Sequence, residues 1–177
     1  MKHIITLIFI TTFLVCCNKD DNPIPTNPVD QLPPATQTGA NTFGCLLDGQ
    51  VFKPGLTNNS LDCVYQFIDN EYYFSLQGNK RDTNNNIILV GLSTKAKQIE
   101  QNNTYQLLEN IIGNAYGTYA YATIFTYTNQ INSGELKITK LDFTNNIVSG
   151  TFWYDIKDSQ NVVHQVRDGR FDMQFTQ

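Results

Sequence analysis

Apolar and polar side chains alternate strictly near the C-terminal end of this chain. Residues 170–175 read Arg, Phe, Asp, Met, Gln and Phe, and residues 147–156 alternate in the same way. A repeat of two residues is typical of a β-strand with one buried face, because successive side chains of a strand point to opposite sides. Helix-favouring Ala and Glu are scarce, while turn-forming and β-forming residues are abundant. We therefore expect an all-β fold.

Two-residue turn signals separate several of the alternating segments. Asp48-Gly49 predicts a hairpin between strands at 43–47 and 50–52, and Asp69-Asn70 lies between strands at 63–68 and 71–77. Asp168-Gly169 predicts a third hairpin, which joins 162–167 to 170–175. With that loop, His164 would face Met173, on the apolar face of the sheet or at its rim.

Further strands are expected at 86–93, 116–127, 135–141 and 147–156. Only 94–108 is ambiguous, because its sequence would tolerate one or two helical turns. Short hairpin connections without long helical crossovers favour antiparallel pairing. The sequence predicts an antiparallel β-sandwich or flattened barrel of about nine to ten strands, after a signal peptide and a Pro-rich linker.

The N-terminus has the layout of a secretion signal. Lys2 and His3 are followed by twelve apolar or threonine residues at 4–15. Twelve helical residues span about 18 Å, well short of the ~30 Å hydrocarbon core of a bilayer. This segment is therefore expected to be the apolar region of a signal peptide rather than a membrane anchor.

A pair of cysteines ends this apolar run. The order Leu14-Val15-Cys16-Cys17 resembles a bacterial lipobox, with Cys16 as the small residue before the cleaved bond and Cys17 as the new, acylated N-terminus. The alternative is that Cys16 is the acylated N-terminal residue, but Val15 would then occupy the small-residue position. A secreted product with ordinary thiols is the remaining alternative. Several acyl chains on Cys17 would make membrane attachment effectively permanent.

A proline-rich segment separates the lipid anchor from the rest. Residues 18–38 hold five of the six prolines, so this stretch is expected to be extended, polyproline-like chain that could reach ~65 Å from the bilayer. We expect three parts: a signal peptide at 1–16, a lipidated Cys and Pro-rich linker at 17–38, and one all-β domain at 39–177. The segment Lys19-Asp20-Asp21 also looks like a surface-export signal, which indicates the outer membrane and the cell exterior; the periplasmic face stays open.

Segments at both ends of the predicted domain resemble one protein family. Residues 32–49 (LPPATQTGANTFGCLLDG), 148–154 (VSGTFWY) and 168–172 (DGRFD) are similar to the opening and closing strands of a family of Bacteroidetes lipoprotein domains of uncharacterised function. The similar segments lie near the two ends of residues 32–177. The resemblance implies a small extracytoplasmic β-domain and brings no catalytic residues with it.

Signals for catalysis and for cofactors are absent from the sequence. His164 is the only histidine after the signal peptide, and no zinc-protease, nucleophile-elbow or phosphate-loop motif occurs. Asp82 opens a calcium-like D-x-N-x-N run, but Ile87 and Ser93 occupy the positions where such a loop needs Gly and an acid. We expect a non-enzymatic domain with no cofactor and no bound metal. A pair of converging carboxylates, as in glycosidases, is not excluded by sequence.

The net charge of −4 and the pI near 5.0 speak against nucleic-acid binding. The expected partners are the membrane, through the lipid anchor, and another envelope protein or a glycan. Cys45 and Cys63 are the two remaining cysteines, and the expected compartment is oxidising, so one interpretation is a disulfide between them. Two separately buried thiols are the other.

One segment is unusually rich in tyrosine. If 116–127 is a single strand, one face carries Tyr119, Tyr121, Phe125 and Tyr127, and the other carries small and aliphatic residues. The rings would be either buried or exposed as a platform for sugars or peptides; burial is the commoner arrangement. Trp153 has the same ambiguity. The sequence thus leaves two functions: a non-catalytic surface lipoprotein that makes interactions or has a structural role, and a carbohydrate-binding module that uses the tyrosine-rich strand.

Overall fold

The computed structural model describes residues 27–57 and 59–177, and in these residues one short helix and eleven strands are formed. The all-β prediction is confirmed. No helix in the described part of the chain is long and apolar enough to cross a membrane. The elements are η1 (Pro28–Gln31), β1 (Thr42–Leu47), β2 (Gln50–Phe52), β3 (Leu61–Ile68), β4 (Glu71–Arg81), β5 (Ile87–Thr94), β6 (Thr104–Leu107), β7 (Ala115–Tyr121), β8 (Ile124–Tyr127), β9 (Gly134–Asp142), β10 (Ile147–Lys157) and β11 (Val163–Gln174).

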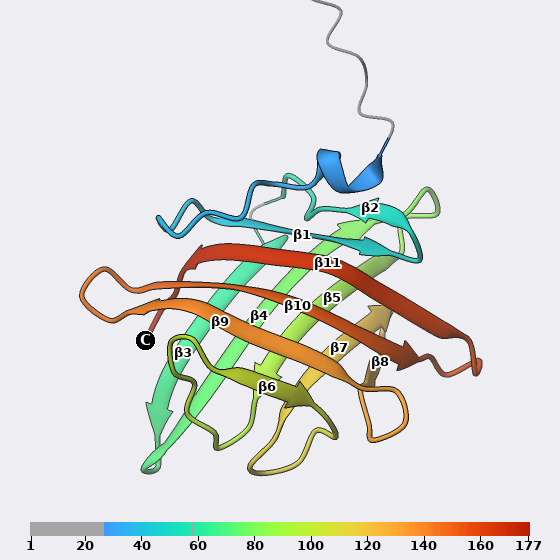
Figure 1. Ribbon diagram of the computed structural model, residues 1–177. Helices are drawn as coiled ribbons and strands as arrows, with labels where there is room; N and C mark the ends of the chain where they lie inside the picture. The colour runs from blue at the N-terminus through green and yellow to red at the C-terminus, as the bar shows by residue number, and fades with distance from the viewer. Residues whose placement is uncertain (1–26, 58) are drawn as a thin grey trace, which may run out of the picture.

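The strands form a single sheet that curls over, so that β9, β10 and β11 cross in front of β3, β4 and β5 (Figure 1). Hydrogen-bonded neighbours follow the order β2-β1-β11-β10-β9-β6-β7-β5-β4-β3, and β8 pairs with β7 outside this path. The sheet is not closed. At one corner, however, the amide of Thr176 donates to the Cys63 carbonyl (3.0 Å) and the Tyr65 amide donates to the Thr176 carbonyl (2.8 Å). This geometry fits the predicted sandwich or flattened barrel.

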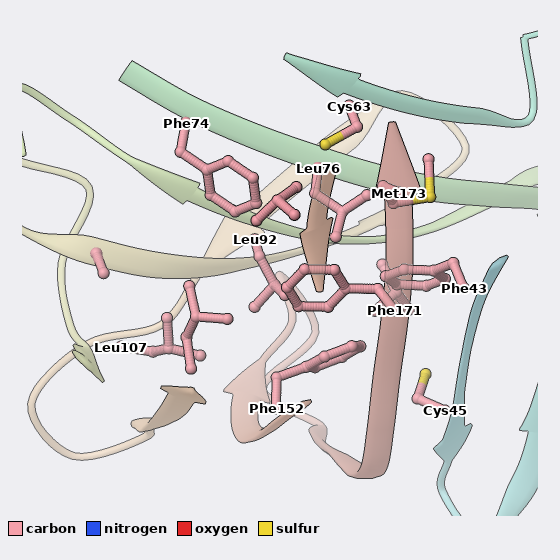
Figure 2. Packing of buried hydrophobic residues seen from close by; sticks show 14 of the residues in the cluster. Phe43, Cys45, Cys63, Phe74, Leu76, Leu92, Leu107, Phe152, Phe171 and Met173 are labelled. Carbon is pink, nitrogen blue, oxygen red and sulfur yellow. The ribbon is translucent and has the colours of Figure 1, made fainter. Parts of the chain in front are cut away.

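The space between the two halves of the sheet is filled with apolar side chains. Figure 2 shows Phe43, Phe152 and Phe171 packed together, with ring centroids of Phe43 and Phe152 5.4 Å apart. Tyr154 is fully buried, and its hydroxyl donates to the Thr118 carbonyl (2.7 Å), so β10 is tied to β7 across the core. Burial of each large apolar side chain contributes about 1.5–3 kcal/mol. The interior is therefore a packed core.

Two of the predicted hairpins are confirmed. Asp48 and Gly49 join β1 to β2 with φ of 52° and 76°, and Asp69 and Asn70 join β3 to β4 with φ of 50° and 67°. Positive φ at both central residues is the requirement of a type I′ turn, which Asx and Gly residues meet at low cost. The alternation predicted for 147–156 is confirmed from residue 150 onward, because Phe152, Tyr154 and Ile156 are buried while Trp153 points outward; residues 147–150 are all buried.

The hairpin predicted at Asp168-Gly169 is wrong, because this pair lies inside the continuous strand β11. β11 is paired on both sides, with β1 and with β10. Between the pairs Gly44↔Arg170 and Leu46↔Arg167, Asp168 and Gly169 of β11 together face one residue of β1, so the Asp-Gly pair forms a bulge. Asp168 has the positive φ (52°) of a turn residue, but without a reversal of the chain. His164 consequently pairs with Ile156 and not with Met173.

The long strand predicted at 116–127 is also wrong, because the chain reverses at Ala122 and Thr123. β7 and β8 form a hairpin in which Tyr121 pairs with Ile124. The ambiguous segment 94–108 contains no helix; it ends in β6, which runs parallel to β7. The sheet is therefore mixed rather than purely antiparallel, and it has eleven strands instead of nine to ten.

The domain begins earlier than the predicted boundary at residue 39. Leu32 is buried, and Pro33 packs so closely on Gly44 that a Cβ there would lie 2.6 Å from the proline ring. We call residues 32–40 the strap. It crosses the outer face of the sheet beside β1, and its threonines and amides bind the buried carboxylate of Asp172. Cys17 and the linker up to residue 26 lie outside the described residues.

Candidate functional site

A cavity opens at the end of the folded sheet where β7 and β8 meet the turn between β10 and β11. The strands themselves can be followed in Figure 1. We call it the mouth cavity. Its volume is about 280 Å³. The inner faces of the β7–β8 hairpin form one wall, and residues 158–164 form the other. The lining side chains are Tyr119, Tyr121, Ile124, Thr126, Asp158, Ser159, Gln160, Val162 and His164.

His164 lies at the rim of this cavity between two carboxylates. Its Nδ1 is 2.7 Å from Oδ2 of Asp48, and its Nε2 is 3.4 Å from Oδ2 of Asp158. The ring also stacks on Tyr119, with centroids 4.4 Å apart. Both ring nitrogens thus face carboxylates of neighbouring turns, and one ring face is covered. The contacts of His164 with Asp48, Asp158 and Tyr119 tie three hairpins together, and each ring nitrogen lies next to a carboxylate.

Asp158 is positioned by its own turn. One carboxylate oxygen accepts hydrogen bonds from the amides of Gln160 and Val162, each at 2.8 Å. The amide of Val162 and then that of Gln160 favour the charged form and lower the pKa of Asp158 below its ordinary value, although burial acts in the opposite direction. The carboxylate therefore stays negative at neutral pH, beside the cavity.

Tyr121 stands on the opposite wall and is fixed by the β4–β5 turn. Its hydroxyl donates to Oδ2 of Asp82 (3.0 Å) and accepts from Nδ2 of Asn86 (3.0 Å). The other oxygen of Asp82 accepts from the amides of Asn84 and Asn86, so this carboxylate caps the loop that the calcium-like run had marked. Among the described residues, no group of three His, Cys, Asp or Glu side chains is arranged to hold a metal ion.

The predicted tyrosine platform is not formed, because the reversal at Ala122 changes which side chains share a face. Tyr119 is buried and Tyr121 points into the mouth cavity, whereas Phe125 and Tyr127 lie on the outer face of the hairpin. There the ring of Tyr127 meets Tyr116 edge-on, with centroids 5.6 Å apart. The four residues thus divide into two pairs on opposite sides of the sheet.

Trp153 is the second candidate for recognition and lies on the outer face of β10. Its indole is 41% exposed, and its Nε1 donates to Oε2 of Glu135 (3.4 Å). The guanidinium of Arg167 lies over the ring, 5.5 Å from its centroid, and is held by Asp155. A shallow hollow of about 390 Å³ adjoins the indole, with Thr104, Lys137, Thr151 and Arg170 among its lining residues.

Comparisons with models of protein families, with curated proteins and with solved structures find no match.

The disulfide considered for Cys45 and Cys63 is not formed in the structure. Both are free, buried thiols, on β1 and β3 respectively. Figure 2 shows them on different sides of the core, with the side chains of Phe43 and Met173 nearby. Burial raises the pKa of each thiol far above its ordinary value. They behave as small apolar residues of the core.

Sequence reasoning missed the two partners of His164. Asp48 and Asp158 lie in separate turns, 116 and 6 residues away from the histidine. Asp48 was recognisable as a turn residue, and Asp158 lies two residues after the end of the strand predicted at 147–156. Neither signal shows that the two turns meet, because their approach depends on β1 and β10 both pairing with β11.

Proposed function

We propose that this chain is a lipid-anchored, non-catalytic domain of the bacterial outer membrane that acts through contacts of its surface with another envelope component. The observation that carries the proposal is the order Leu14-Val15-Cys16-Cys17 directly after an apolar run too short to span a bilayer. The proposal includes membership of the Bacteroidetes lipoprotein family that the opening and closing motifs resemble.

The strap supports this arrangement. Asn27, the first described residue, is ten positions after Cys17 (27 − 17), and a fully extended chain of that length reaches at most about 35 Å. Because the strap packs along β1, the end of the domain that carries η1 would lie nearest to the lipid. The domain would then be mounted close to its membrane, much nearer than the ~65 Å that the whole linker could reach.

The surroundings of His164 support a non-catalytic role. A general base needs a ring nitrogen within hydrogen-bond reach of a substrate proton. Both nitrogens of His164 instead face the carboxylates of Asp48 and Asp158, and Tyr119 covers one ring face. This geometry suits a residue that joins turns.

Acylation is tested by metabolic labelling with a clickable fatty acid in a bacterial host. We expect label on the wild-type chain and on Cys16→Ser, which keeps a small residue before the cleavage site, and no label on Cys17→Ser. Label that persists on Cys17→Ser would contradict the assignment. Protease treatment of intact cells then separates the two leaflets, because only a domain that faces the exterior is degraded.

Carbohydrate binding is a second candidate, and the outer face around Trp153 is the observation that favours it. An exposed indole offers a flat apolar surface for a sugar ring. Glu135, bound to Nε2 of Gln106 (3.1 Å), and the neighbouring Lys137 offer acceptors and donors beside it. This surface replaces the tyrosine-rich strand, whose rings point to opposite faces.

A glycan array distinguishes this candidate from a purely structural or protein-binding role. We expect Trp153→Ala to abolish binding of any glycan that the wild-type domain retains, while Phe125→Ala, a change on the outer face of β8, leaves that binding intact. The candidate is wrong if no glycan binds, or if the binding is indifferent to Trp153→Ala.

A further inference from the structure

The mouth cavity combines an apolar body with a negative rim. Its walls present the aliphatic side chains of Ile124 and Val162 and the ring of Tyr121, all of which are exposed. A ligand with a compact apolar part could therefore displace water from both walls. Ser159, Gln160 and Thr126 add only a few neutral polar groups.

The charges around the cavity have one predominant sign. Asp158 lines the cavity, Asp48 contacts its lining residue His164, and Asp82 accepts a hydrogen bond from the hydroxyl of Tyr121. None of the nine lining residues is Lys or Arg. The guanidinium of Arg81 donates to the Asn85 carbonyl in the same β4–β5 turn as Asp82. Even with this positive charge, the three carboxylates leave a net negative charge whether or not His164 is protonated. The cavity therefore attracts cations and repels anions.

The aromatic ring adds a second attraction for the same class of ligand. The face of a tyrosine ring carries negative potential and binds organic cations within about 6 Å of its centroid. Tyr119 is covered by His164, but Tyr121 is 41% exposed and is held by Asp82 and Asn86 in a fixed orientation. Fixed rings lose little entropy when a ligand binds.

From these features we infer that the mouth cavity is a binding site for a small organic cation, an ammonium group carried on a compact apolar body. The apolar walls hold the body, and the Tyr121 ring and the Asp158 carboxylate attract the charge. An inorganic metal ion is not the expected ligand, because no cluster of three metal-binding side chains occurs in the described part of the chain. The inference is independent of the lipid anchor and of the Trp153 surface.

The test compares two ligands of the same shape, choline and its neutral isostere 3,3-dimethylbutan-1-ol, by ligand-observed NMR titration of the domain. We expect saturable binding of choline and affinity for the neutral isostere at least about tenfold lower, because only choline gains the electrostatic attraction. Added NaCl should weaken choline binding, since part of the attraction is between exposed charges.

Two pairs of variants assign the binding to the mouth cavity. Tyr121→Leu is matched by Tyr127→Leu, which changes a ring of nearly equal exposure (41% and 40%) on the opposite face of the same hairpin. Asp158→Asn keeps an oxygen for its turn amides and is matched by Asp155→Asn on the outer face of β10. We expect Tyr121→Leu and Asp158→Asn each to weaken choline binding by about fivefold or more, and both controls to stay within about twofold.

Three outcomes would overturn the inference: no saturable binding of choline, equal binding of the neutral isostere, or equal losses in the variants and their controls. Tyr121→Leu changes an exposed side chain, so it keeps the test decisive if Asp158→Asn disturbs its turn. A circular dichroism spectrum of each variant establishes that it is folded.

Discussion

Asp172 is a buried carboxylate that holds the strap on the sheet. Its two oxygens accept hydrogen bonds from the hydroxyl of Thr36 (2.6 Å), the amides of Thr38 (2.9 Å) and Gly39 (2.8 Å), and the hydroxyl of Ser149 (2.8 Å). Burial by itself would raise the pKa of Asp172, but these hydrogen bonds outweigh it and hold the pKa far below its ordinary value. The charged form is therefore part of the native structure.

We predict that this carboxylate makes the stability of the domain depend on acid pH. Because the folded pKa lies below the unfolded value of about 3.9, the stabilisation is fully present above that value and is lost as the pH falls toward the folded pKa. Asp172→Asn should lower the free energy of unfolding at pH 7 by about 2–4 kcal/mol, since several buried donors lose a charged acceptor.

Urea denaturation at pH 7, 5 and 3 checks this prediction. The wild-type domain should lose stability between pH 5 and pH 3 more steeply than Asp172→Asn. Asp168→Asn is the control, because Asp168 is exposed in the bulge of the same strand. Equal pH dependence in the wild-type and Asp172→Asn domains would show that the strap is not held by this charge.

At the scale of elements, the bulge in β11 decides which side chains face the core. With Arg167 and Asp168 both opposite Trp153, the alternation of β11 shifts by one residue, so Val166 and Phe171 both point inward. Gly169 lies against Phe152, and a Cβ at this position would be 2.6 Å from both the phenyl ring and the carbonyl oxygen of Phe152. Glycine is required here for close approach of the two strands.

We therefore expect Gly169→Ala to lower the free energy of unfolding by about 2–3 kcal/mol, because the backbone of β10 or β11 would have to shift. Gly55→Ala is the matched control, since the nearest atom to a Cβ at Gly55 would be 3.8 Å away. It should change stability by less than about 0.5 kcal/mol. Chemical denaturation of both variants measures the difference; similar losses would mean that the bulge tolerates a side chain.

At the scale of the whole molecule, chain segments distant in sequence hold the open sheet together. The strap joins the N-terminal end of the domain to β11 and β10 through Asp172, and Thr176 joins the C-terminal end to β3. Figure 1 shows the strap and η1 beside β1 and β2, on the side of the sheet where the chain enters the fold. Both ends of the domain therefore contribute to its stability.

Removal of the strap should show that it acts through Asp172. A chain that begins at Asn41 loses the donors of the strap and the buried side chain of Leu32, so we expect a loss of about 3 kcal/mol. In that shortened chain, Asp172→Asn should cost less than about 1 kcal/mol, because water replaces the missing donors. A double-mutant cycle by urea denaturation measures this coupling, and additive losses would contradict it.

The alternation of apolar and polar side chains was sufficient to predict the fold class and the inward face of β10. The turn residues were sufficient to predict the hairpins at Asp48-Gly49 and Asp69-Asn70. These features depend on local conformational preferences and on which side of a strand is apolar, and both can be read from neighbouring residues. The lipobox at Cys17 is likewise a local motif, and its assignment stays a prediction from the sequence.

Whether a given pair of residues reverses the chain was decided only by the tertiary structure. Asp168-Gly169 has a stronger turn signal than Ala122-Thr123, yet the first is a bulge and the second is a turn. Strand pairing on both sides of β11 stabilises the continuous strand over its whole length, and this gain depends on partners about 20 and 120 residues away. The same long-range pairing gathered Asp48, Asp158 and His164. Local preferences amount to about 1 kcal/mol per residue and yield to the summed hydrogen bonds and buried area of such pairings.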